Sequence, residues 1–190
     1  MIILASQSPR RRELLQKLNI PFTVRVADVD ETMDKHLPLT EAVAQLSRRK
    51  AEGVFREEED IVIAADTIVV LGDTVLGKPR DEADAFRMLS LLSGREHQVM
   101  TGLTVLKGQR ALTHTEITDI HFRALTPGEI RAYIRTGDPM DKAGSYGIQN
   151  GGALFAEKLV GDYFNVVGLP VCRLGQLLKQ IDPDLMEDTQ

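Results

Sequence analysis

Several features that would assign this sequence to a broad class are missing or scarce. It has one cysteine, Cys172, so no disulfide can form within the chain, which fits the reducing cytoplasm. No apolar run approaches the length of a membrane span, and Met1–Ala5 is too short for a signal peptide. Cys172 itself lies in an apolar stretch and is expected to be a small core residue. We therefore expect a cytoplasmic protein without membrane contact.

The sequence also has no net positive charge and few aromatic rings. The net charge is −5, and aromatic residues make up 5% of the chain. Nucleic-acid binding depends on a basic surface and, for single strands, on rings that stack with bases. Nucleic acid is therefore not an expected partner, and a phosphate ligand would have to meet a local cluster of cations.

The sequence does contain enough apolar residues to form a core. It has 190 residues, of which 43% are hydrophobic and 27% carry charges of both signs. This composition argues against disorder and predicts a single domain over residues 1–190. The acidic tail after about residue 182 is expected to be frayed.

The stretch from Ile61 to Leu76 contains three predicted strands and an acidic residue between two of them. Ile61–Ala65 and Ile68–Leu71 are short, β-branched apolar runs that predict buried strands, and Thr74–Leu76 predicts a third strand after a tight turn. Asp66 lies between the first two runs. A buried carboxylate is costly unless something binds it, so Asp66 either hydrogen-bonds a turn or helix terminus or serves a ligand.

Lys78 follows this hairpin directly. Pro79 restricts the backbone of Lys78 to extended conformations, so the cation is held in a defined direction. An acid at Asp66 and an oriented lysine one hairpin later suit a metal ion and a phosphate side by side.

The first predicted helix begins with cations. Ser8 is a good N-cap, Pro9 suits the first helical position, and residues 10–12 are all arginine. The helix dipole disfavours cations at this end, so the sequence predicts either a solvated basic turn or an anion site. It is not a Walker loop, because the GxxxxGK[ST] pattern is absent. The anion site would consist of Ser6, Arg10 and Arg11.

Two further features of the sequence, an acidic pair and a lysine, each have a plain structural interpretation. Asp30 and Glu31 follow a predicted strand and form an acidic pair of the kind that is usually solvated. Lys50 falls on or beside the apolar face of a predicted helix, so it either extends past that face to solvent or supplies a second cation near Lys78.

A glycine-rich segment lies in the last third of the chain. Residues 141–149 and the glycines at 151 and 152 predict either a series of turns or a backbone that a ligand approaches closely. The amide of Gln149 can donate to and accept from a base edge. Three of the four histidines have no metal-ligand spacing to one another and are expected to lie outside any site: His97, His114 and His121.

The remaining elements follow from hydrophobic periodicity and from residues that begin or end helices. Thr40, Asp81 and Thr126 are expected to begin helices, and Thr126 forms a capping box with Glu129. Further strands are expected at Ile2–Ala5, Phe22–Val26, Val99–Leu106, Thr113–Phe122, Leu154–Val160 and Asn165–Val167, and a last helix at Pro170–Ile181.

Taken together, these motifs resemble the Maf family of nucleoside triphosphate pyrophosphatases. The matching stretches occur in the family's order and cover nearly the whole chain: LASQSPRRRELL, AADTIVV, GKPRD, HQVMTGL, DKAGSYGIQ and VVGLP. The resemblance implies an α/β fold with a central mixed β-sheet flanked by helices, and two lobes with a substrate cleft between them, similar to inosine triphosphatases. It also implies a homodimer, a divalent metal ion (Mg²⁺ or Mn²⁺), and hydrolysis of a nucleoside triphosphate to the monophosphate and pyrophosphate.

The resemblance also implies roles for individual positions. Asp66 matches the catalytic acid and Glu31 a second acidic site residue. Both would bind the metal, and the division of the metal-binding and proton-accepting roles between them stays open. The combination of Arg10, Thr67 and Gln149 resembles the dTTP/UTP-directed members, whereas members directed at 7-methyl-GTP carry an aromatic residue where Arg10 stands. The phosphate-contacting positions are Ser6, Arg10, Arg11, Lys50 and Lys78.

Two other functions are considered beside this one. The first is hydrolysis of a modified nucleotide, such as 5-methyl-UTP, pseudo-UTP or 7-methyl-GTP. The second is a nucleotide-binding regulator of septum formation with little turnover. A regulator without catalysis would be expected to lack the acid at Asp66 or the cations at Lys50 and Lys78, and all three are present.

Overall fold

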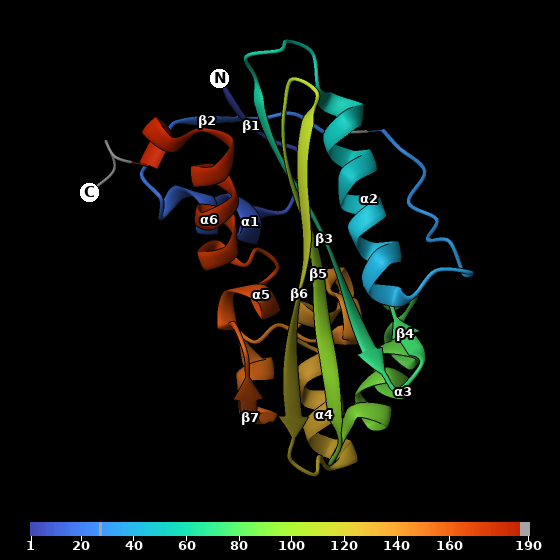
Figure 1. Ribbon diagram of the computed structural model, residues 1–190. Helices are drawn as coiled ribbons and strands as arrows, with labels where there is room; N and C mark the ends of the chain where they lie inside the picture. Colours follow the sequence, from blue (N-terminus) through green and yellow to red (C-terminus); the bar gives the residue numbers. More distant parts are fainter. Residues whose placement is uncertain (27, 187–190) are drawn as a thin grey trace. The chain divides into compact units, whose positions relative to one another are not determined.

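The computed structural model describes residues 1–26 and 28–186 (Figure 1). Helices and strands are mixed through residues 1–122, and helices predominate after residue 122. The α-helices are α1 (Pro9–Gln16), α2 (Leu39–Val54), α3 (Glu82–Leu92), α4 (Pro127–Ile134), α5 (Tyr163–Val167) and α6 (Val171–Ile181). The strands are β1 (Ile2–Leu4), β2 (Phe22–Val24), β3 (Ile61–Leu71), β4 (Thr74–Leu76), β5 (Glu96–Lys107), β6 (Arg110–Phe122) and β7 (Ala156–Val160). The 3-10 helices are η1 (Asp138–Asp141), η2 (Ala143–Ser145), η3 (Gly151–Leu154) and η4 (Pro183–Met186).

The strands form a mixed sheet. Their order is β2-β1-β3-β5-β6-β7, and β4 pairs with β3. β1 is parallel to both neighbours, with Ile3 opposite Thr23 of β2 and Val62 of β3. β4 is antiparallel to β3, and β7 is antiparallel to β6. The predicted α/β fold with a central mixed sheet flanked by helices is confirmed.

The chain divides into two compact units. Unit 1 consists of Met1–Asp66, Thr101–Glu116 and the chain from Gly168 onward, and unit 2 consists of Thr67–Met100 and Ile117–Val167. β3, β5 and β6 therefore each contribute residues to both units, with the division in β3 falling between Asp66 and Thr67. The cleft between two lobes stays a prediction.

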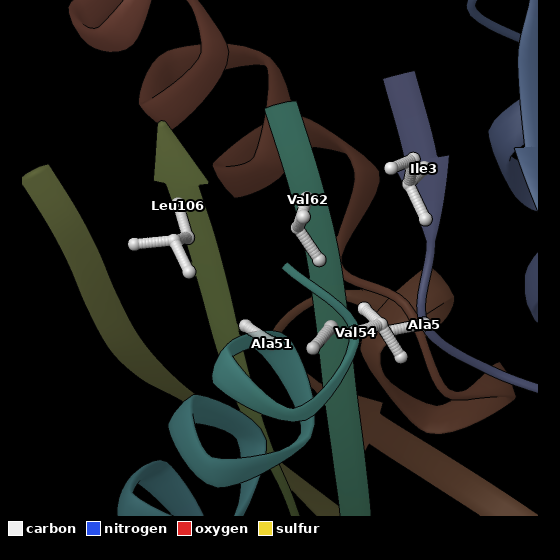
Figure 2. Close-up of a cluster of buried hydrophobic side chains, with 7 residues drawn as sticks. Ile3, Ala5, Ala51, Val54, Val62 and Leu106 are labelled. Carbon is white, nitrogen blue, oxygen red and sulfur yellow. The ribbon is translucent and has the colours of Figure 1, made fainter. Parts of the chain in front are cut away.

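The core of unit 1 fixes helix α2 on the sheet. Figure 2 shows Ala51 and Val54 of α2 beside Ile3, Val62 and Leu106 of β1, β3 and β5. All five side chains are at most 6% exposed. Since burial of apolar surface contributes about 25 cal/mol per Å², this cluster is a main source of the attachment of α2.

A close backbone approach supports the same packing. A Cβ atom on Gly102 of β5 would lie 2.3 Å from the carbonyl oxygen of Val43 in α2, so only glycine fits there. α2 thus contacts β5 through its backbone near Val43 and contacts three strands through Ala51 and Val54. This packing determines where Lys50, the neighbour of Ala51, can reach.

The core of unit 2 is aromatic. The rings of His97 and Tyr146 both meet Phe122 edge to face, with centroids 4.8 and 4.7 Å away, and Tyr133 meets Phe155 at 5.1 Å. Nε2 of His97 lies 2.8 Å from the hydroxyl oxygen of Tyr146. Burial lowers the pKa of His97 to about 4, so the ring is neutral at physiological pH. His97 is therefore a core residue.

Capping residues in the sequence correctly predicted the N-termini of three helices. The Ser8 hydroxyl accepts the N–H of Arg11 at the start of α1, and the Asp81 carboxylate accepts the N–H of Asp84 in α3. The capping box of α4 is formed by Thr126 and Glu129 in both directions.

Other expectations were wrong. Asn165–Val167 was expected to be a strand but belongs to helix α5. The carboxylate of Asp162, the residue before α5, accepts the N–H of Phe164. The side-chain amide of Asn165 donates to the carbonyl of Val99. Thr40 does not cap α2, because the helix already begins at Leu39 and its cap position is Pro38.

Asp66 does not separate two strands, because β3 runs without interruption from Ile61 to Leu71. Cys172 was expected in the core but is exposed. Its position on α6 explains this: the buried face carries Leu174, Leu178 and Ile181, and Cys172 stands about 200° around the helix from Leu174. Helical periodicity outweighs the apolar character of the neighbouring sequence.

The tail expected to be frayed is described only in part. Pro183–Met186 form η4, and residues 187–190 lie outside the described residues. Among the residues that the structure describes, none of the helices has the length and apolar character needed to cross a membrane.

Candidate active site

Lys50 of unit 1 lies between two carboxylates. Its ammonium nitrogen is 2.5 Å from a carboxylate oxygen of Asp66 in β3 and 2.8 Å from one of Glu31 in the segment between β2 and α2. The side chains of Lys50 and Asp66 are 12% and 17% exposed, whereas that of Glu31 is 69% exposed. The structure therefore brings together three of the predicted site residues, with the carboxylates of Glu31 and Asp66 each paired with the Lys50 ammonium.

The packing of α2 accounts for this cluster. Ala51 and Val54 bury one face of α2 against the sheet, so the side chain of Lys50 follows the edge of that face toward β3. Lys50 does not extend past the helix to solvent, because its ammonium is bound by Asp66. A buried or half-buried charge is stable only when paired, and this pairing satisfies both groups.

Arg11 is oriented by hydrogen bonds at both ends of its guanidinium. Nε donates to the carbonyl of Gly168 at 2.8 Å, and Nη1 donates to the Ser6 hydroxyl oxygen at 3.3 Å. The backbone N–H of Ser8 also donates to the Ser6 oxygen at 3.2 Å. Ser6, which is 8% exposed, therefore connects the end of β1 to the first turn of α1.

The charges of α1 are coupled to the Lys50 cluster. Burial lowers the pKa of the Arg11 guanidinium, and the neighbouring Arg10 lowers it further, while the negative charges of Asp66 and Glu31 act in the opposite direction. Arg10 and Arg11 occupy the first turn of α1, where the helix dipole adds positive potential. The structure thus gathers six predicted residues in unit 1: Ser6, Arg10, Arg11, Glu31, Lys50 and Asp66.

Arg49, the neighbour of Lys50 in α2, binds the segment that carries Glu31 and was not identified from the sequence. Its Nη2 donates to the carbonyl of Thr32 at 2.7 Å, and the N–H of Thr32 donates to the Asp30 carboxylate at 2.9 Å. Arg49 therefore anchors to α2 the segment that carries Glu31. The only sequence signal was its position next to Lys50.

Lys78 and Thr67 lie in unit 2. The carbonyl of Gly77 accepts the N–H of Gly144 at 3.1 Å, so the segment of Lys78 is bonded to the glycine-rich segment. A Cβ on Gly144 would come within 2.9 Å of Val69, and Val69 shares a face of β3 with Thr67. Lys78 itself is exposed.

Gln149 is exposed at the end of the glycine-rich segment. Its neighbours on both sides are held by Tyr133, Asp138 and Lys142, for which the sequence suggested no role. Unit 2 therefore contains the three remaining predicted residues, Thr67, Lys78 and Gln149.

The donor set around Lys50 fits a magnesium or manganese ion. Within residues 1–26 and 28–186, no group of three or more His, Cys, Asp or Glu side chains could hold a metal ion. Glu31 and Asp66 nevertheless converge on one cation, the ammonium of Lys50. Mg²⁺ is usually bound through one or two carboxylates, with substrate phosphates and water completing the octahedron. Two convergent carboxylates meet that requirement.

Comparison with known proteins places the chain in a family. The family described as Maf-like protein matches residues 1–181. A dTTP/UTP pyrophosphatase of Bacillus cytotoxicus is 49% identical over 181 residues, which are 95% of each chain. One of Halalkalibacterium halodurans is 49% identical over 179 residues, 94% of each chain. The solved structure of the Staphylococcus aureus Ham1 protein has a TM-score of 0.48 and 13% identity, and covers 95% of this chain and 98% of its own. The match over residues 1–181 and the identity to these relatives show that this chain belongs to the Maf family.

Proposed function

We propose that this protein is a nucleoside triphosphate pyrophosphatase that hydrolyses dTTP and UTP to the monophosphate and pyrophosphate. The observation that carries the chemistry is the position of Lys50 between Asp66 and Glu31, beside the arginines of α1. The choice of substrate is supported by the relatives, which are named dTTP/UTP pyrophosphatases and are 49% identical to this chain.

In this proposal Glu31 and Asp66 would hold a divalent metal ion, Mg²⁺ or Mn²⁺. When bound, such an ion withdraws charge from phosphate oxygens and lowers the pKa of a coordinated water. Lys50 offsets the charge of both carboxylates before the substrate arrives, and it contacts phosphate oxygens in the complex. The convergence of the two carboxylates on one cation supports this assignment.

Asp66 is proposed as the proton acceptor. A water oxygen bonds to the α-phosphorus, the bond from that phosphorus to the bridging oxygen breaks, and pyrophosphate leaves with the electron pair. The proton of the attacking water passes to Asp66. Ser6, Arg10 and Arg11 bind phosphate oxygens at the N-terminus of α1, where the backbone also favours anions.

Three further residues, Lys78, Thr67 and Gln149, are proposed to contact the nucleotide. Lys78 supplies a further cation for the phosphates. Thr67, Gln149 and Arg10 are each proposed to contribute to pyrimidine selectivity. A site whose polar groups are all paired by the correct base discriminates strongly against a base that leaves them unpaired.

The proposal also includes the cellular compartment and the oligomeric state. The protein is proposed to act in the cytoplasm, because its one cysteine allows no disulfide within the chain. It is proposed to form a homodimer, as the family resemblance implies.

The experiment is a pyrophosphate-release assay with Mg²⁺ or Mn²⁺ over a panel of canonical and modified triphosphates. Wild type is compared with Asp66→Asn and Gln149→Ala. We expect release from dTTP and UTP, loss of release in Asp66→Asn, and a narrower difference between pyrimidine and purine substrates in Gln149→Ala. Release only from a modified nucleotide such as 7-methyl-GTP would reject the assigned selectivity. Binding without release from any nucleotide would favour the regulator of septum formation.

A further inference from the structure

The carboxylate of Asp138 in η1 is the centre of a hydrogen-bond network in unit 2. The hydroxyl of Tyr133 donates to Oδ2, and the side-chain amide of Asn150 donates to Oδ1 at 2.6 Å. The ammonium of Lys142 lies 3.0 Å from Oδ1. Three donors therefore converge on one side chain: Tyr133 of α4, Lys142 between η1 and η2, and Asn150 directly after Gln149.

Tyr133 extends this network to the backbone before and after Gln149. Its hydroxyl oxygen accepts the N–H of Gly147 at 2.9 Å. A Cβ on Gly151 would lie 2.9 Å from two atoms of the Tyr133 ring, so the chain passes directly against that ring. Gln149 lies midway between these two glycines. One tyrosine thus fixes the backbone two residues before Gln149 and two residues after it.

Lys142 also contacts this segment. Its ammonium donates to the carbonyl of Asp138 at 2.8 Å and to the Asp141 carboxylate at 2.7 Å. Its aliphatic stem packs on Gly147, where a Cβ would lie 2.6 Å from Cε. Lys142 is only 8% exposed, so its charge is tolerated because these acceptors satisfy it.

Two members of the network, Asp138 and Tyr133, have pKa values that are shifted from their usual values. Burial alone would raise the pKa of Asp138, but hydrogen bonds from Tyr133, Lys142 and Asn150 outweigh burial and hold that pKa below its usual value. Burial, reinforced by Asp138, raises the pKa of Tyr133. Asp138 therefore stays a carboxylate that accepts, and Tyr133 stays a hydroxyl that donates.

We propose that Tyr133, Asp138 and Lys142 position Gln149 and thereby set the selectivity for pyrimidine bases. This inference rests on the proposed function, in which Gln149 reads the base. Gln149 is exposed and lies in a segment of turns, where a side chain gains a defined direction only if its backbone is held. Selectivity depends on that direction more than turnover does, because an amide that misses the base edge loses its discrimination while the phosphate groups stay in place.

The test is the ratio of kcat/KM for UTP to kcat/KM for ATP in wild type and in Tyr133→Phe. The substitution removes one oxygen and keeps the ring against Gly151. We expect this ratio to fall about 10-fold. The fall should come from a raised KM for UTP, while kcat/KM for ATP stays unchanged. Tyr163→Phe is the matched control, because Tyr163 is an exposed tyrosine of the same unit, and it should leave the ratio unchanged.

Hydrogen exchange gives a readout that does not depend on activity. The backbone N–H of Gly147 should exchange faster in Tyr133→Phe than in wild type, and Tyr163→Phe should not change it. An unchanged ratio or unchanged exchange would overturn the inference, as would an equal loss for both nucleotides. A wild type without preference for UTP would instead reject the proposed function and the inference together, so the two failures are distinguishable.

Discussion

The ammonium nitrogen of Lys50 lies 2.5 Å from a carboxylate oxygen of Asp66, although the two residues come from a helix and a strand. Neither side chain is more than 17% exposed. Each group stabilises the charge of the other, and each is proposed to act on the substrate. Removing one of them should therefore affect both catalysis and the charge balance of the site.

Lys50→Met should lower kcat/KM for dTTP about 100-fold, because a cation that offsets phosphate charge is lost from a half-buried site. Steady-state kinetics measures this, with Lys179→Met as control, since Lys179 is exposed on α6. Lys50→Arg should retain more activity than Lys50→Met. A folded Lys50→Met protein with wild-type kcat/KM would contradict the role assigned to Lys50.

Arg49→Ala should weaken metal binding several-fold, because Glu31 loses the anchor that Arg49 provides through the Thr32 carbonyl. The neighbouring Arg48 is the matched control: it pairs with Glu52 on the surface of α2, where such pairs contribute little. Calorimetric titration of Mn²⁺ into each variant measures the affinity. If Arg48→Ala and Arg49→Ala bind Mn²⁺ equally well, the anchor has no influence on the proposed metal ligands.

Gly102→Ala should destabilise the protein by about 3 kcal/mol or more, because the new methyl group meets the backbone of Val43 and pushes α2 away from β5. Gly128→Ala in α4 is the control, since its nearest neighbour would be the Thr126 hydroxyl at an ordinary 3.9 Å. Urea unfolding measures both. Equal midpoints for the two variants would show that α2 does not depend on this contact.

Stability should fall on acidification through His97. Burial lowers the pKa of His97 from 6.5 to about 4, so the unfolded chain binds a proton before the folded chain does. The free energy of unfolding should therefore decrease as the pH falls from 6.5 toward 4, by up to about 3 kcal/mol. His97→Gln should flatten this dependence, whereas His36→Gln, at an exposed position, should not. Denaturation curves at several pH values give the result, and an identical slope in His97→Gln would contradict it.

Local signals predicted local structure well. Ser8, Asp81 and Thr126 were identified as helix caps because capping depends on residues three positions away at most. The β-branched runs around Asp66 predicted β3, although not that the strand continues through the acid. Expectations failed where tertiary contacts decide: Asn165 lies in a short helix and donates its amide to Val99, which no pattern of three residues reveals.

The candidate site was predicted residue by residue but not as a set of contacts. Sixteen positions separate Lys50 from Asp66, and their ion pair depends on how α2 packs on the strands. Arg49 and Tyr133 were missed for the same reason, because each acts through a backbone group far along the chain, at Thr32 and Gly147. Such partners have no signature in spacing or composition.

The most direct test of the central claim is the fate of oxygen during hydrolysis of dTTP in water enriched in heavy oxygen, with wild type and Asp66→Asn side by side. The account predicts dTMP and pyrophosphate as products, with the heavy oxygen in dTMP, and turnover reduced at least about 100-fold in Asp66→Asn. Formation of dTDP and phosphate, heavy oxygen in pyrophosphate, or undiminished turnover in Asp66→Asn would contradict attack at the α-phosphorus with Asp66 as the proton acceptor.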